Sequence, residues 1–138
     1  MVSKEQAEKE FQLFVEEMNI KERKLRTLTE IDEQGKSNKT DFIEGIETGN
    51  ITVDESGFVS VNLDYPIQQG DKIIEKITFK KRRITVEDMN KHVRGKTDTQ
   101  KAISLTAWLT NCLPTEIERL DGDDFSMLGT VSAFFLPR

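Results

Sequence analysis

The sequence from Phe58 to Met89 reads FVSVNLDYPIQQGDKIIEKITFKKRRITVEDM and indicates a β-hairpin followed by a short helix. Apolar residues alternate with polar ones over 59–67, the period-two pattern of a strand with one buried face. Residues 68–71 predict a turn, because Gly70 readily takes the positive φ that hairpin loops often need. The second predicted strand places three apolar residues on one face: Ile73, Ile77 and Phe79.

The segments on either side extend this hairpin into a larger unit. Residues 51–53 predict a third strand and 54–57 a turn, which gives a three-stranded antiparallel meander. Capping residues then mark the starts of four C-terminal helices: Thr85 with Asp88, Thr97 with Gln100, Thr115 with Glu118, and Asp121. The predicted fold class is α+β, a small antiparallel sheet covered by C-terminal helices, with an N-terminal amphipathic helix.

The N-terminal region predicts a helix over residues 4–33. Its apolar residues recur at spacings typical of a helix face: Phe11, Phe14, Met18, Leu25 and Leu28. The stripe packs on its own domain in one interpretation, and mediates self-association or partner binding in the other. Residues 35–50 hold three glycines and predict a connector with a short docking turn. The expected organisation is an N-terminal amphipathic helix (1–34), a connector (35–50) and a core domain (51–138).

Composition limits the classes of protein that the chain can belong to. With 138 residues, of which 36% are hydrophobic and 33% charged, it suits one domain with a modest core, or an oligomer that shares apolar surface. It has no apolar run of about 18 residues, and its charged start does not resemble a secretory signal. A single cysteine fits a reducing cytoplasm, and the net charge of −5 argues against general nucleic-acid binding.

Residues for catalysis or metal binding are scarce. His92 and Cys112 are the only histidine and cysteine, whereas metal sites of this ligand type need three or four such residues. The acidic stretch 121–124 predicts helix capping, because it lacks the spaced ligands and the closing glutamate of a calcium loop. Phosphate-binding and nucleophile motifs are also missing. We therefore expect no catalytic residues, no metal and no cofactor.

Two features are candidate partner-binding surfaces. The first is the basic run, which comprises Lys80, Lys81, Arg82 and Arg83. It is either solvated or meets an acidic surface, and it has no interleaved aromatic residues of the kind that bind nucleic acid. The second is the terminal helix, which we expect to form the floor of an exposed groove with Leu128, Val131, Phe134 and Phe135. Neighbouring helical residues diverge by about 100°, so one of the two phenylalanines should stay available. Trp108 and Phe125 are expected in the core.

The order of elements between Ile51 and Phe135 also carries a family resemblance. Its motifs are the strand ending LDYPI at 63–67, the strand IEKITF at 74–79 with the basic run, the helix through Trp108, LPTEIERL at 113–120, and a final amphipathic helix. In this order they resemble the phage tail assembly chaperone family of Mu-like and P2-like contractile-tailed phages. The first 50 residues lie outside the resemblance.

The resemblance implies a non-enzymatic function in the cytoplasm of a bacterial host that carries a phage or prophage. Members of the family are thought to coat the tape measure protein before the tail tube polymerises around it. A longer, frameshifted form often recruits tail tube protein. The expected partners are therefore the tape measure protein and the tail tube protein, with homo-oligomers as a further expectation and neither nucleic acid nor membrane. The alternative is a structural tail or baseplate subunit that stays in the virion.

Overall fold

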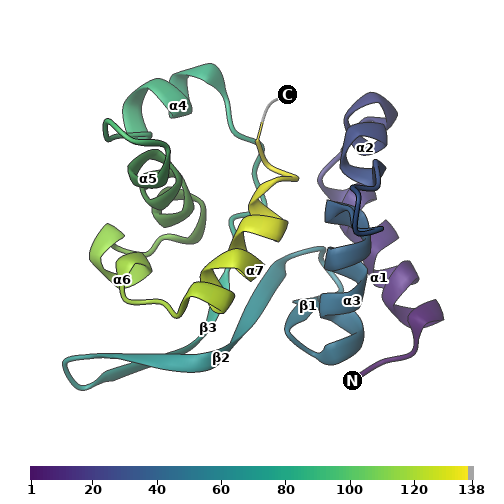
Figure 1. The fold of residues 1–138 in the computed structure, drawn as a ribbon, viewed down its shortest axis with the longest axis horizontal. Coiled ribbons are helices and arrows are strands. Elements are labelled where there is room, and N and C mark those ends of the chain that lie inside the picture. The colour runs from purple at the N-terminus through teal and green to yellow at the C-terminus, as the bar shows by residue number, and fades with distance from the viewer. Residues whose placement is uncertain (137–138) are drawn as a thin grey trace.

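The computed structural model describes residues 1–136 and places a three-stranded sheet between two sets of helices along the chain. The strands are β1 (Ile51–Val53), β2 (Val59–Gln69) and β3 (Lys72–Thr78). The preceding helices are α1 (Lys4–Glu17), α2 (Glu22–Thr29) and α3 (Asn38–Thr48). The following helices are α4 (Val86–His92), α5 (Asp98–Thr110), α6 (Pro114–Glu118) and α7 (Gly122–Ser132). Figure 1 shows α1–α3 on one side, α4–α6 on the other, and α7 between the two groups. The predicted α+β class is confirmed.

The sheet is the predicted antiparallel meander, with the strands in the order β1-β2-β3. The pairing of β2 with β3 is interrupted between Asn62 and Ile67, so that residues 63–66 of β2 face only Glu75 of β3. Backbone N–H groups in such an irregular segment lose their ladder partners. The carboxylate of Asp124 on α7 replaces them, because its two oxygens accept the N–H groups of Asp64 and Tyr65 at 3.0 Å each.

This irregularity changes which side chains of the hairpin face the core. Tyr65 and Ile73 were expected on the buried face, but they are 58% and 62% exposed, and Ile74 is buried in place of Ile73. Strict alternation over the hairpin is therefore wrong near its tip. Because successive strand residues point to opposite faces, a register shift moves the following residues to the other face.

The N-terminal region forms two helices instead of the single helix predicted over 4–33. The chain leaves the helical conformation at Asn19, which has a φ of 53° and cannot continue a right-handed helix. The apolar stripe still faces inward across the break. Phe11, Phe14, Met18 and Leu28 are buried and Leu25 is half-buried against the same core.

Most of the region 35–50, where the sequence indicated a connector, forms helix α3. Two of the glycines that suggested a loop have other roles. Gly45 lies inside α3, where a Cβ atom would come within 2.6 Å of the Ile51 side chain, and so lets the helix approach β1 closely. Gly49 ends the helix in the left-handed conformation with a φ of 88°. Ser37 and Thr40 form a capping box at its start.

An aromatic cluster joins the two ends of the chain. Phe134, just after α7, packs edge-on against Phe11 and Phe42 with ring centroids 5.6 and 5.2 Å away. Phe14 stacks on Phe42 at 5.0 Å and lies 5.9 Å from Phe135. The hydrophobic core therefore includes side chains from α1, α3 and the end of the chain. The division into a 1–34 helix, a connector and a 51–138 domain stays a prediction, which this shared core does not favour.

The C-terminal caps are mostly as predicted. Thr85 and Thr97 accept the N–H groups of Asp88 and Gln100, and Asp121 accepts that of Asp123. The predicted Thr115 cap is wrong, because Thr115 lies inside α6, which begins at Pro114 and has Leu113 as its N-cap. There the Glu116 side chain accepts the N–H group of Leu113 at 2.8 Å. Proline suits the first helical position, where its missing N–H costs nothing.

Candidate functional site

The terminal helix does not offer an exposed groove. Leu128 and Val131 are fully buried, and Phe134 and Phe135 are only 1% and 4% exposed. The two phenylalanines diverge, but Phe134 enters the aromatic cluster while Phe135 stacks on Phe79 at 5.5 Å. The expectation that one of them stays available is therefore wrong in this conformation. Partner binding through these four residues stays a prediction.

The basic run is held by contacts within the chain. Lys81 forms an ion pair of 3.0 Å with Glu17 at the end of α1. Arg83 donates from Nη1 to the carbonyl oxygens of Met18 and Asn19 at 3.3 Å each. These residues fasten the segment after β3 to the turn between α1 and α2. Neither expectation for the basic run, a solvated face or an acidic partner, anticipated these contacts.

The side chains of the other two members of the basic run, Arg82 and Lys80, contact residues of α4 and α5. Arg82 donates to both carboxylate oxygens of Asp88, at 2.8 and 3.0 Å. The Thr85 backbone N–H and Arg82 lower the pKa of Asp88, which favours its charged form. Lys80 Nζ lies 4.0 Å from the centroid of the Trp108 ring. Burial, together with the nearby Arg82, lowers the pKa of Lys80.

The prediction that Trp108 lies inside the core is wrong, because this residue packs at the edge of the core. Its ring is half-buried and stacks on His92, with centroids 5.3 Å apart and planes inclined by 18°. The guanidinium carbon of Arg82 lies 5.4 Å from the same ring. Phe125, the other expected core residue, is also half-buried. The tryptophan therefore holds cationic side chains beside the end of β3.

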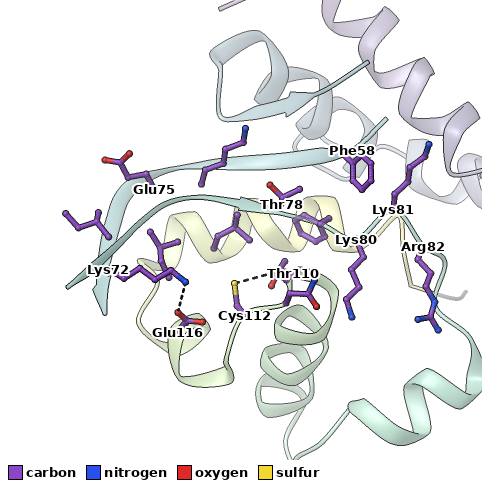
Figure 2. Close-up of a pocket in the computed structure, with 16 residues that line it drawn as sticks. Phe58, Lys72, Glu75, Thr78, Lys80, Lys81, Arg82, Thr110, Cys112 and Glu116 are labelled. Carbon is purple, nitrogen blue, oxygen red and sulfur yellow. Dashed lines mark hydrogen bonds and ion pairs between the residues drawn. The ribbon is translucent and has the colours of Figure 1, made fainter. Parts of the chain in front are cut away.

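A groove of about 920 Å³ runs along β3, between this strand and the segment that joins α5 to α6. We call it the β3 groove (Figure 2). Thr110 and Cys112 at the end of α5 lie across from the strand, and Glu116 of α6 meets Lys72 at 4.0 Å. Cys112 is half-buried here. Ile73, whose side chain is exposed, adds an apolar surface near the hairpin tip.

The groove is basic although the chain as a whole is acidic. Its lining contains five cationic side chains and two carboxylates: Lys72, Lys76, Lys80, Lys81 and Arg82, with Glu75 and Glu116. Figure 2 shows Lys80 and Arg82 pointing toward the helical side of the groove and Lys81 pointing the other way. Three of the four residues of the basic run thus line the groove. The arrangement attracts an acidic ligand.

Within residues 1–136 no group of three or more His, Cys, Asp or Glu residues is placed to hold a metal ion. In the acidic stretch 121–124, Asp121 caps α7 and Asp124 binds the backbone of β2. No helix among these residues is long and apolar enough to cross a membrane.

Sequence reasoning missed the groove because it singled out the basic run and overlooked the strand before it. Lys72 and Lys76 could have indicated that this strand is at the edge of the sheet, since lysines commonly protect an exposed edge strand. Sequence reasoning also missed Lys24, which donates from Nζ to the carbonyl oxygen of Phe134 at 2.7 Å. No local pattern links two residues so far apart in the sequence.

Comparison with known proteins identifies one family. Neither a curated protein nor a solved structure was found to match the chain. A family model described as "Phage tail assembly chaperone proteins, E, or 41 or 14" matches residues 60–137, which extend from β2 through α7 and include most of the β3 groove. The match covers more than half of the 138 residues and agrees with the resemblance found in the sequence. The chain belongs to the phage tail assembly chaperone family.

Proposed function

We propose that this protein assists phage tail assembly by binding the tape measure protein in the host cytoplasm, without catalysing a reaction. The observation that carries the proposal is the family match over residues 60–137. In this proposal the protein binds the tape measure protein reversibly and leaves it as the tail tube forms around it. A phage or a prophage could encode the protein, and the tail tube protein is a second proposed partner.

The shape of the molecule supports a binding role. Its groove is open, basic and lined by both apolar and charged side chains, as expected of a surface that takes up and releases a protein segment. Phe134 and Phe135, which follow α7, are buried in the core in this structure. We therefore place the main contact with the partner at the β3 groove, including Lys80, Lys81 and Arg82 of the basic run.

The test is co-expression with the tape measure protein of the same phage or prophage, with an affinity tag on the tape measure protein. We expect the chaperone to be captured and the tape measure protein to be more soluble than when expressed alone. A tagged virion protein of similar length but from outside the tail is the control.

Mass spectrometry of purified virions separates the two functional alternatives. A chaperone is released as the tube grows, so it should be missing from particles that contain the tape measure and tube proteins. Its presence in stoichiometric amount would instead establish a structural tail or baseplate subunit. Failure of the capture experiment would overturn the proposed function.

A further inference from the structure

The β3 strand has an open edge. It is the last strand of the sheet and pairs only with β2. The bond from the Phe79 N–H to the Val59 oxygen, 2.9 Å, shows that the backbone of Phe79 faces β2. In an antiparallel ladder, alternate residues face the partner strand. Ile77 therefore also faces β2, whereas the backbone groups of Lys76 and Thr78 point away from it.

Only the end of this edge is covered by the chain itself. The N–H group of Lys80, on the same side as those of Lys76 and Thr78, donates to the Leu109 oxygen of α5 at 2.8 Å. Before that point the β3 groove separates the strand from the α5–α6 segment. The whole of β3 is seven residues long, about 23 Å of extended chain, and Lys76 and Thr78 present their outward-facing backbone groups in its second half. An extended segment could lie there and bond to the free backbone groups.

Side-chain charge selects the kind of segment that fits. Lys76 lies in the middle of the edge, and within residues 1–136 its ammonium group makes no ion pair. Lys72 has only a distant partner in Glu116, at 4.0 Å. Carboxylates on an added strand would therefore meet lysines that still lack close partners. Opposite charges on directly facing strand residues stabilise the pair.

The same charges disfavour a second copy of this chain at the edge. In an antiparallel pair of β3 strands centred on Ile74, Lys72 of each copy would face Lys76 of the other. Centring the pair on Glu75 would bring the two glutamates together, and centring it on Lys76 would bring two lysines together. Like charges directly opposite destabilise strand pairing. Self-association through this edge is thus opposed in each of these registers.

We propose that an extended, acidic segment of the tape measure protein adds to β3 as a fourth strand and lies in the β3 groove. Main-chain hydrogen bonds to the outward-facing groups of β3 would supply affinity for a strand, and the lysines would supply selectivity for acidic residues. This inference rests on the proposed function, because it takes the tape measure protein as the partner. It specifies the surface, the conformation and the charge of what binds.

Two substitutions at Lys76 separate the contribution of main-chain hydrogen bonds to partner binding from the contribution of the lysine charge. Lys76→Gln removes the charge and keeps the N–H group, whereas Lys76→Pro removes both. Proline is tolerated on an edge strand where the N–H faces away from the sheet, so the fold should survive. We expect Lys76→Gln to weaken capture in a salt-dependent way, and Lys76→Pro to weaken it by about a further tenfold through lost main-chain bonding. Lys101→Gln, an exposed lysine of α5 outside the groove, is the matched control.

Amide hydrogen exchange on the wild-type complex provides a test that needs no variant. Binding should slow exchange at Lys76 and Thr78 and leave Ile77 and Phe79, already paired with β2, almost unchanged. If the tape measure protein is captured but these amides exchange as in the free protein, the strand-addition model is wrong and the proposed function stands. The same holds if a folded Lys76→Pro variant binds as wild type does. If the wild type captures nothing, both proposals fall.

Discussion

Replacing Phe14 with alanine tests whether the N-terminal helices share one cooperative core with the family segment. Phe14 is fully buried and contacts Phe42, Phe134 and Phe135 with ring centroids 5.0–5.9 Å away. Truncating a buried phenylalanine typically costs about 3–5 kcal/mol, because transfer energy is lost and a cavity is left. That is a large share of the roughly 5–15 kcal/mol that stabilises a typical domain. The melting temperature should fall by roughly 10–20 °C.

Trp108 makes this experiment informative about cooperativity. It is the only tryptophan of the chain and lies on α5, outside the aromatic cluster that contains Phe14. Urea unfolding followed by its fluorescence should shift together with unfolding followed by far-UV circular dichroism. Phe58→Ala, which truncates a phenylalanine that is 40% exposed, is the matched control and should cost much less.

This reasoning is refuted if Phe14→Ala leaves the urea midpoint of the Trp108 fluorescence transition unchanged while part of the circular-dichroism signal is lost at lower urea concentration. The N-terminal helices would then be an appendage, as the 1–34 division expects. A chain that begins at Gly49 provides a second measurement. The shared aromatic core predicts that it loses cooperative unfolding, whereas the division with a separate 51–138 domain predicts that it folds.

Two further predictions concern single polar contacts. Burial and the nearby Arg83 lower the pKa of Lys24 to about 8, so between that pH and its ordinary value of 10.5 the folded state binds fewer protons than the unfolded state. Stability from this group should therefore rise with pH across that window, and urea titrations should show a smaller rise for Lys24→Met than for wild type; equal slopes would contradict the assigned environment. Asp124→Ala leaves two N–H groups of β2 without their acceptor and should cost roughly 2–4 kcal/mol in urea unfolding. Its exposed neighbour offers the control Asp123→Ala, and an equal loss from both would show that the contact with β2 is unimportant.

Features set by neighbouring residues could be predicted from the sequence. Alternation over 59–63 and a glycine at the turn specify the hairpin, and the caps at Thr85 and Thr97 are complete within four residues. Such patterns depend only on local geometry and on the backbone groups that a helix end leaves free. For this reason the sheet topology and most helix starts agree with the structure.

Features set by distant residues could not be predicted in this way. The irregular segment of β2 depends on Asp124, which lies some sixty residues away in the chain. Gly45 suggested a loop because its close approach to Ile51 is visible only in the folded chain. Phe134 and Phe135 are both buried because the core reaches them from two directions, through Phe42 and through Phe79. A helix considered alone has one buried face, whereas one at the centre of a fold has more.

The position of the family match separates the residues that stabilise the fold from those that we propose bind the partner. The match begins at residue 60, yet Phe134 within it packs against Phe11 and Phe42, which lie before it. The matched segment therefore depends on α1 and α3 to close its core. By contrast, the open edge of β3 and the lysines along it lie wholly within the match. If the edge binds the partner, a substitution such as Lys76→Gln should change capture without changing stability. Phe14→Ala should change stability first and capture only through loss of the fold.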